Sequence, residues 1–251
     1  MAGHSHWAKV RHYKVISDAR KGKLFSKLSR EITVAARLGG GDPDFNPRLR
    51  RAIQAARAES MPMENIERAI LKGTGQLAGE AWEDVCYEGY GPGGVAILVQ
   101  ALTDNRNRTA AEIRSIFARH GGNLAGVGSV AWLFQKRGVV LIEGGEVPEE
   151  TIWEAALEAG AEDIRASDEG WEVITPVEKL ESVQRALESA HVPIQSASLA
   201  FLPQTLVPIE DPDTARSVLR LCDALEAHDD VQHVYSNFDI ASDILAEEAR
   251  R

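Results

Sequence analysis

The sequence predicts an α+β fold with a helical N-terminal part followed by a larger part of mixed strands and helices. Two observations lead to this prediction. Apolar residues recur at helical spacing between residues 18 and 73, whereas short apolar runs alternate with helical segments after residue 79. The chain of 251 residues is long enough for two or three modest domains, and an apolar share of 44% is enough to build ordinary hydrophobic cores.

Three amphipathic helices are predicted in the N-terminal part. They extend over residues 18–38, from the Asn46-Pro47 pair onward, and from Pro62 to Gly73. In the first helix, Leu28 and Ile32 belong to one apolar stripe, and the glycines at 39–41 end the helix. Asparagine before proline is a typical helix start. We expect the three helices to share one core, preceded by an extended basic arm over residues 1–16.

Strands and helices alternate in the remainder. Strands are expected at 85–87, 95–103, 131–134, 138–142, 164–167, 171–175, 197–201 and 231–235, and helices at 109–119, 148–159, 176–190 and 212–227. Residues 138–202 alone follow the order β-α-β-β-α-β, which is that of a ferredoxin-like domain. The predicted domains are therefore 1–79, a second ferredoxin-like α/β domain made of 80–137 with 203–251, and the inserted domain 138–202.

Charge is distributed unevenly along the chain. The formal net charge is −10, but residues 1–79 carry 15 Lys and Arg against 7 Asp and Glu, and the remainder carries 13 against 31. A basic segment on an acidic body is typical of a protein with a local nucleic-acid-binding surface. The alternative is that solvated surface charges are simply clustered.

The basic segment supplies candidate contacts to phosphate. Trp7 and Tyr13 lie among its charges, and aromatic side chains of this kind stack on unpaired bases. Histidine in the arm suits stacking or phosphate contact better than metal binding, because no further ligands follow at rigid spacing. The candidate nucleic-acid-binding residues here are His4, Trp7, Lys9, Arg11, Lys14, Arg20, Lys21, Lys23, Lys27 and Arg30.

Two further arginines are candidates in the segment 104–109. Arg106 and Arg108 lie where a strand ends and a helix begins, and the dipole of a helix disfavours cations at its N-terminus. Each therefore needs an acidic partner, which is either a carboxylate of the chain itself or a phosphate. Both interpretations stay open.

Several function classes receive no support. The segment 89–94 matches G-x-G-x-x-G, but a strand rather than a helix follows it, so a glycine-rich hairpin turn is expected instead of a nucleotide site. The segment 228–233 mixes His and Asp and is expected to be a plain surface turn. Neither catalytic motifs nor metal-ligand spacings occur, so we expect no enzyme, no metal and no cofactor. Two cysteines and the lack of a long apolar run predict a cytoplasmic protein without a membrane span.

A resemblance to a known family rests on motifs spread along the chain. They are residues 1–8 (MAGHSHWA), 38–44 (LGGGDPD), 46–50 (NPRLR), 87–94 (YEGYGPGG), 103–109, 121–124 (GGNL) and 234–237 (VYSN). Together they resemble the YebC family, also known from the mitochondrial translational activator of cytochrome oxidase subunit one. His6, Lys9 and His233 depart from the residues usual in that family.

The resemblance implies a three-domain fold and a non-enzymatic regulator of gene expression. We therefore expect a nucleic-acid-binding regulator of the YebC type, and DNA-binding regulation of transcription is the function that the resemblance favours. The alternative is a ribosome- and rRNA-associated translation factor that assists synthesis of proline-rich stretches. The acidic part of the chain is repelled by phosphate. We therefore expect it to contact a basic protein surface on the ribosome or the transcription machinery instead.

Overall fold

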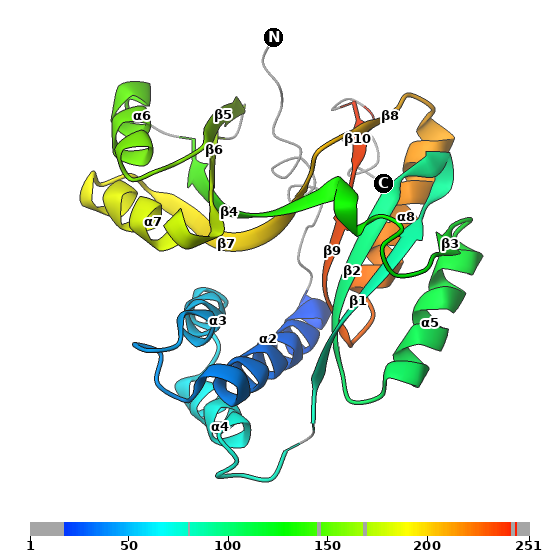
Figure 1. The fold of residues 1–251 in the computed structure, drawn as a ribbon, viewed down its shortest axis with the longest axis horizontal. Helices are drawn as coiled ribbons and strands as arrows, with labels where there is room; N and C mark the ends of the chain where they lie inside the picture. Colours follow the sequence, from blue (N-terminus) through cyan, green and yellow to red (C-terminus); the bar gives the residue numbers. More distant parts are fainter. Residues whose placement is uncertain (1–17, 80, 145–146, 168–169, 242–243, 245–251) are drawn as a thin grey trace. The chain divides into compact units, whose positions relative to one another are not determined.

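The computed structural model describes residues 18–79, 81–144, 147–167, 170–241 and 244. Its helices and antiparallel sheets form an α+β fold, which confirms the predicted class (Figure 1). Among the described residues two compact units are present: 18–131 with 209–236, and 132–208 with 237–241. The first unit holds both the helical part and a four-stranded sheet, so the division into three domains at 79, 137 and 202 stays a prediction.

The helical part consists of α2 (Asp18–Gly39), α3 (Pro47–Ala58) and α4 (Met63–Gly73), as predicted. Its core includes the fully buried side chains of Ile32, Leu49 and Ile66. Met63 lies outside this core with 47% exposure, and the buried Met61 before the helix contributes instead. Thus α3 and α4 each pack an apolar stripe against α2, and the three helices share one core.

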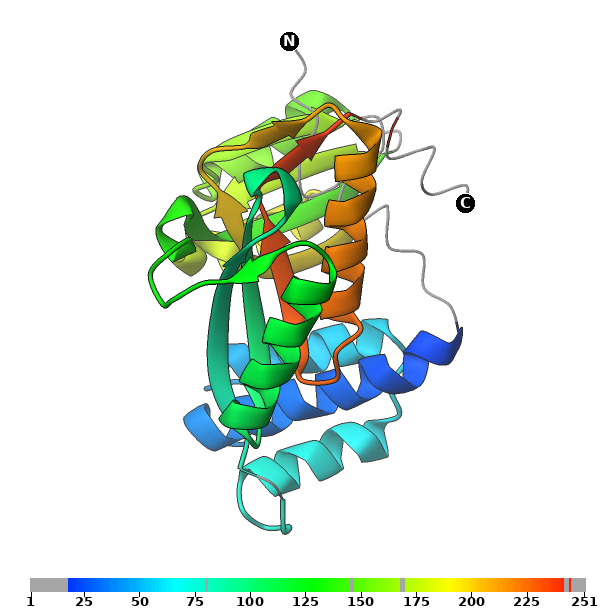
Figure 2. The same ribbon diagram turned by 90° about the vertical axis from the view of Figure 1, so that its right-hand side faces the viewer.

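The sheet of the first unit has the order β3-β1-β2-β9, and its paired strands run antiparallel. The strands are β1 (Glu83–Tyr90), β2 (Ala96–Thr103), β3 (Asn123–Leu124) and β9 (Val231–Ser236). Helices α5 (Arg106–Arg119) and α8 (Pro212–Glu226) lie side by side against one face (Figure 2). The spatial order is that of a ferredoxin-like sheet, but β1 precedes β2 through a hairpin instead of following β3.

The glycine-rich segment 89–94 forms this hairpin. The β1–β2 register runs from Glu83 opposite Thr103 to Tyr90 opposite Ala96. Between the strands, the short 3₁₀ turn η1 (Pro92–Gly94) follows Gly91, whose N–H donates to the carbonyl of Val95 at 2.8 Å. No helix begins after the glycines, so the predicted hairpin turn is confirmed.

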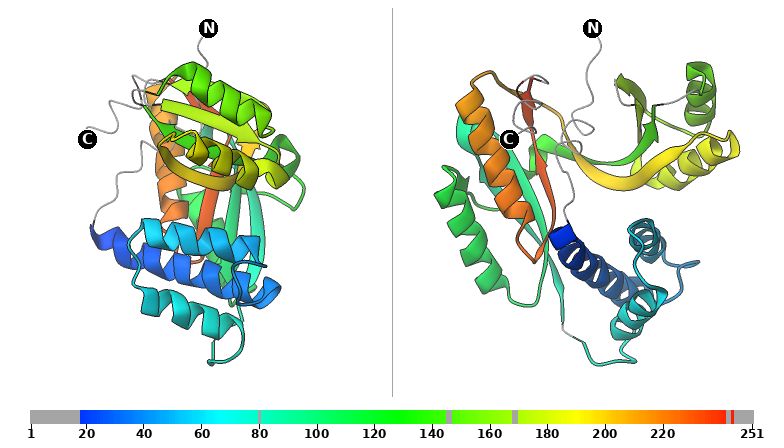
Figure 3. Two further views of the ribbon diagram at one scale, coloured as in Figure 1. Left: turned by 90° about the vertical axis from the view of Figure 1, so that its left-hand side faces the viewer. Right: turned by 180° about the vertical axis from the view of Figure 1, so that it is seen from behind.

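The second unit contains the sheet β5-β6-β4-β7, the strand order of a ferredoxin-like domain (Figure 3). Its strands are β4 (Phe134–Glu143), β5 (Asp163–Ser167), β6 (Gly170–Thr175) and β7 (Ile194–Pro203). Helix α6 (Glu149–Glu158) and helix α7 (Leu180–Ser189), which follows the 3₁₀ turn η3 (Val177–Lys179), pack on one face. The β-α-β-β-α-β order expected for 138–202 is therefore present.

One predicted strand is wrong. Residues 131–133 form the 3₁₀ turn η2 (Ala131–Leu133), and Phe134 begins β4, which continues without a break to Glu143. The strand is continuous because β7 pairs with it along almost its full length. A small sheet of β8 (Val207–Ile209) and β10 (Phe238–Ile240) was not expected from the sequence. Within the described ranges, no helix combines the length and apolar character needed to cross a membrane.

Candidate nucleic-acid interface

Two predicted phosphate-contacting lysines of α2 reach the turn between α8 and β9. This segment, residues 226–230, is called the acidic turn below because it contains Glu226, Asp229 and Asp230. The Nζ of Lys23 lies 3.2 Å from a carboxylate oxygen of Asp229. The Nζ of Lys27 donates to the backbone carbonyl of Glu226 at 2.6 Å. Both cations therefore already have acceptors within the protein.

Burial changes the protonation of Lys27. Desolvation lowers its pKa from 10.5 to about 8, and the nearby negative charges of Glu226 and Asp229 only partly oppose this shift. The amine of Lys27 is thus protonated near neutral pH, but it loses its proton at a lower pH than an exposed lysine does.

Arg30, one turn further along α2, makes the closest contacts with the acidic turn. Its Nη1 lies 3.1 Å from Oδ1 of Asp230 and also donates to the carbonyl of Asp229. The guanidinium carbon lies 4.3 Å from the ring centre of Trp82, close enough for a cation–π interaction. With a side chain only 19% exposed, Arg30 joins the helical part to the sheet.

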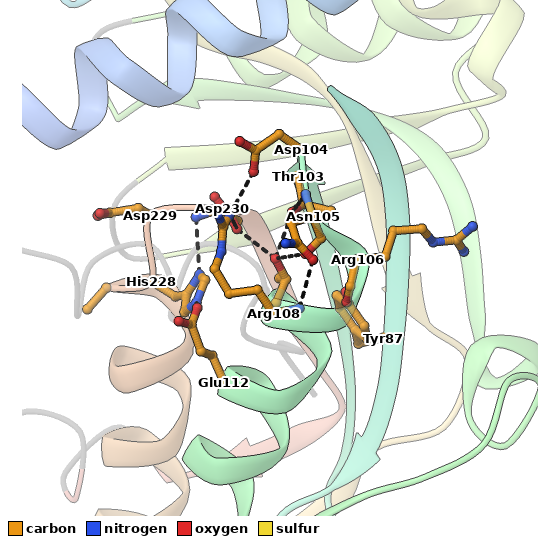
Figure 4. Close-up of polar contacts among 12 residues, drawn as sticks. Tyr87, Thr103, Asp104, Asn105, Arg106, Arg108, Glu112, His228, Asp229 and Asp230 are labelled. Carbon is orange, nitrogen blue, oxygen red and sulfur yellow. Dashed lines mark hydrogen bonds and ion pairs between the residues drawn. The ribbon is translucent and has the colours of Figure 1, made fainter. Parts of the chain in front are cut away.

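Asp230 is the centre of this arrangement, and we call Asp230 with Arg30, Arg108 and Thr109 the Asp230 network. Figure 4 shows Asp230 beside Arg108. Its Oδ2 accepts hydrogen bonds from Arg108 Nη2 at 2.8 Å and from the Thr109 hydroxyl at 2.7 Å. Burial of Asp230 favours the protonated form, but the hydrogen bonds from Thr109 and Arg108 and the charges of Arg108 and Arg30 outweigh it and lower the pKa. The buried carboxylate of Asp230 is thus ionised, and both of its oxygens accept hydrogen bonds from side chains of α2 or α5.

The start of α5 positions the donors to Asp230. Asn105 caps the helix, because its Oδ1 accepts from the N–H of Arg108 at 3.1 Å. The hydroxyl of Thr103, the last residue of β2, lies 2.7 Å from that of Thr109 and accepts from the N–H of Asn105. Turn and capping residues therefore fix the two side chains that bind Asp230.

Both ring nitrogens of His228 form hydrogen bonds that fix the acidic turn. Its Nδ1 accepts from the backbone N–H of Asp230 at 3.1 Å, so Nε2 carries the proton and donates to Glu112 of α5 at 2.7 Å. The segment 228–233 was expected to be a plain surface turn. Instead, its first three residues are bound to α2 and α5.

Arg48 of α3 makes a second connection between the helices and the sheet. It forms a bidentate pair with Glu31 of α2, at 2.7 and 3.0 Å, and reaches Asp84 of β1 at 2.8 Å. The hydrogen bond to Glu31 is the main reason that the pKa of Arg48 is raised. Two separate groups of ion pairs thus hold the helical part on the sheet.

The two arginines of segment 104–109 differ in their partners. Arg108 pairs with Asp104 and Asp230, both at 2.8 Å, so the chain itself supplies its acidic partners. Arg106 is 67% exposed and lies 3.7 Å from Glu83. The structure therefore supports the internal-carboxylate interpretation for Arg108 and leaves Arg106 on the surface.

The other candidates are not placed. His4, Trp7, Lys9, Arg11 and Lys14 lie outside the described residues. Arg20 and Lys21 belong to the first turn of α2, of which only the backbone is described.

The acidic turn is the feature that sequence reasoning missed. Its opposite charge to α2 was visible in the sequence, but Arg30 and Asp230 are 200 residues apart and no local pattern pairs them. Within the described ranges, no group of three or more His, Cys, Asp or Glu side chains is arranged to hold a metal ion.

Comparison with known proteins identifies the family. The model of the TACO1/YebC protein N-terminal domain matches residues 5–76, and that of the TACO1/YebC second and third domain matches residues 82–238. The chain belongs to the TACO1/YebC family. This confirms the resemblance seen in the sequence motifs.

Members of the TACO1/YebC family are similar to the chain along nearly its whole length. A probable transcriptional regulatory protein of Methylacidiphilum infernorum is 57% identical over 245 residues, 98% of each chain. A protein of Aquifex aeolicus with the same description is 53% identical over 245 residues, which again make up 98% of each chain. The crystal structure of a conserved hypothetical protein from Aquifex aeolicus is 52% identical and has a TM-score of 0.85, covering 94% of this chain and 98% of that one.

Proposed function

We propose that this TACO1/YebC chain is a nucleic-acid-binding regulator of gene expression that acts without catalysis in the cytoplasm. The observation that carries the proposal is the concentration of positive charge in residues 1–79 of an otherwise acidic chain. The description of its relatives as probable transcriptional regulatory proteins supports a regulatory function. We therefore propose DNA as the first candidate ligand.

The site geometry modifies how the basic segment would bind. Lys23, Lys27 and Arg30 already contact the acidic turn, so phosphate has to compete with Asp229 and Asp230 for them. The arm and the other basic side chains of the helices then supply the first contacts. The acidic part would face away from the nucleic acid, toward a basic protein partner.

A non-catalytic role is supported by the groups with shifted pKa values. Asp230, Arg108 and Arg48 are held in ion pairs, and the Tyr235 hydroxyl, whose pKa burial raises, is bonded to Gln100 at 3.2 Å. Such shifts arise in structural networks as well as in active sites. Here the charged groups form ion pairs within the chain, and the side chain of Tyr235 is buried.

The second candidate function is the ribosome- and rRNA-associated translation factor. The observation in its favour is that Trp7 and Tyr13 lie among the basic residues of the arm, because aromatic rings stack on unpaired bases. Crosslinking the protein to nucleic acid in cells and sequencing the product distinguishes the two. Promoter fragments support the transcriptional function, and rRNA of the peptidyl-transferase region supports the translational one.

A direct test of nucleic-acid binding is a titration of the full chain with labelled DNA and RNA at increasing salt. We expect log K to fall linearly with log salt, by about 0.9 per phosphate contact on duplex DNA and about 0.7 on single strands. No binding of either nucleic acid at low ionic strength would contradict the proposal.

A further inference from the structure

An aromatic side chain is held in solvent at the connection between α2 and α3. Phe45 is 85% exposed, and this connection extends away from the three helices (Figures 1 and 3). Single exposed apolar residues are common on protein surfaces, so the evidence for a role of Phe45 comes from the groups around it.

The backbone beside Phe45 is fixed by the next residue. Asn46 is buried, donates to the carbonyls of Ala35 and Gly40, both at 2.8 Å, and accepts from the N–H of Leu49 at 3.1 Å. A Cβ on Gly39 would come within 2.6 Å of the Asn46 side chain, so the close approach requires glycine. Phe45 is therefore presented by an anchored connection, which reduces the entropy that a partner must remove.

Basic side chains continue from this connection along α3. At about 100° per residue, Arg50, Arg51, Gln54 and Arg57 fall within one sector, of which Gln54 and Arg57 are exposed and the other two half-buried. The helix itself contains no acidic residue. Basic side chains therefore follow the solvent side of α3 from Arg50 to Arg57.

Arg50 links this side of α3 to the connection. Its Nη1 donates to the carbonyls of Pro43 at 2.9 Å and Asp44 at 3.3 Å. These two carbonyl acceptors hold the guanidinium group of Arg50 beside the connection.

We propose that Phe45, Arg50, Arg51, Gln54 and Arg57, together the Phe45 surface, bind an unpaired nucleic-acid strand. Phe45 stacks on a base and the arginines contact the phosphates. The proposal rests on the proposed function and specifies where and in what form the nucleic acid binds. Asp42 and Asp44 repel phosphate beside Phe45, so the backbone of the strand follows α3 while a base covers the ring. Stacking has no counterpart on an intact duplex, because paired bases do not expose their faces.

The test uses the full chain and three fluorescein-labelled probes: oligo(dT), oligo(U) of equal length, and the oligo(dT)·oligo(dA) duplex. Phe45→Ala is expected to weaken binding of either single strand about tenfold and to leave duplex binding nearly unchanged. Phe45→Trp is expected to restore single-strand affinity. Arg57→Gln is expected to lower the slope of log K against log salt by about 0.7 on single strands.

Matched controls separate local from general effects. Val127→Ala removes an apolar side chain that is 97% exposed elsewhere, and Arg114→Gln removes an exposed charge on α5. Neither is expected to change single-strand affinity as the Phe45 surface variants do. Because Phe45 is exposed, Phe45→Ala is expected to leave the melting temperature unchanged.

The outcomes distinguish this inference from the proposed function. If the wild type binds single strands and Phe45→Ala binds equally well, the Phe45 surface is excluded while nucleic-acid binding stands. If Phe45→Ala instead lowers the molar mass in sedimentation without affecting the probes, the surface is a contact between copies of the chain and the inference is wrong. If the wild type binds no probe, both proposals fail.

Discussion

Arg108 and Asp230 are 122 residues apart in the sequence, and the Nη2 of Arg108 donates to Oδ2 of Asp230 across 2.8 Å. The other oxygen of the same carboxylate lies 3.1 Å from Arg30. One buried anion thus joins α2, α5 and the acidic turn. Ion pairs therefore attach the helical part to the sheet.

Replacing Asp230 with asparagine is expected to lower the free energy of unfolding by about 2–4 kcal/mol, because it leaves two arginines beside a buried group that no longer balances them. Chemical denaturation followed by circular dichroism measures the effect. Asp229→Asn is the matched control: its carboxylate is 65% exposed, and an exposed ion pair contributes below about 1 kcal/mol. Equal loss in both variants would show that the Asp230 network is not what stabilises this region.

The buried ammonium group of Lys27 predicts a dependence of stability on pH. Its pKa falls from 10.5 in the unfolded chain to about 8 in the folded protein. Between these values the unfolded state binds more protons, so this group makes the protein more stable as the pH rises through that window. Cys86 acts in the opposite sense, because burial raises its pKa from 9.0 to about 11.

Comparison of the wild type with Lys27→Met isolates the lysine, since both proteins keep Cys86. We expect the difference in unfolding free energy between them to change steadily from pH 8 to 10.5 and to be constant below this window. Denaturation at several pH values measures it. A difference that does not vary with pH would show that Lys27 is not desolvated in the folded protein.

Asp229→Asn is also expected to affect nucleic-acid binding, if the proposed function holds. Removing this carboxylate leaves Lys23 without its acidic partner, so the lysine becomes available to phosphate. We expect tighter binding of oligonucleotides and a log K–log salt slope steeper by up to about 0.9 on duplex DNA.

Asp213→Asn serves as the control for this effect. It removes one negative charge as well, from a side chain that is 85% exposed on α8 and pairs with Arg216. Fluorescence anisotropy with labelled oligonucleotides compares the two variants. Equal gains in affinity would mean that only the net charge matters and that the acidic turn does not compete with phosphate.

Local periodicity accounts for the part of the fold that the sequence predicts well. Helix α8 and the β-α-β-β-α-β segment were expected from apolar spacing and turn residues, and the structure has them. Strand β3 has two residues and leaves no periodic signal. Residues 131–133 resemble a strand in composition, yet they form a 3₁₀ turn, because pairing with β7 begins only at Phe134.

The candidate site was harder to predict, because charge alone does not reveal partners. Lys23, Lys27 and Arg30 were predicted to contact phosphate, and their helical spacing places them on one side of α2. Whether such cations meet phosphate or carboxylate depends on contacts between segments about 200 residues apart. Arg108 shows the same difficulty, since both kinds of partner fitted its place in the sequence.

The packing of α4 on α2 gives a prediction that is independent of function. Gly73, the last residue of α4, is buried, and a Cβ at this position would meet the carbonyl of Thr33 and come within 2.7 Å of the Ala36 Cβ. Because backbone cannot move aside as a side chain does, Gly73→Ala is expected to lower the free energy of unfolding by about 1–3 kcal/mol.

Gly22→Ala is the matched substitution, since a Cβ there has no atom within 4 Å and the residue lies in an exposed part of α2. It is expected to raise stability by about 0.5–1 kcal/mol through the lower entropy of the unfolded chain. Thermal melting of both variants checks the pair, and a stable Gly73→Ala protein would mean that the two helices do not approach each other this closely.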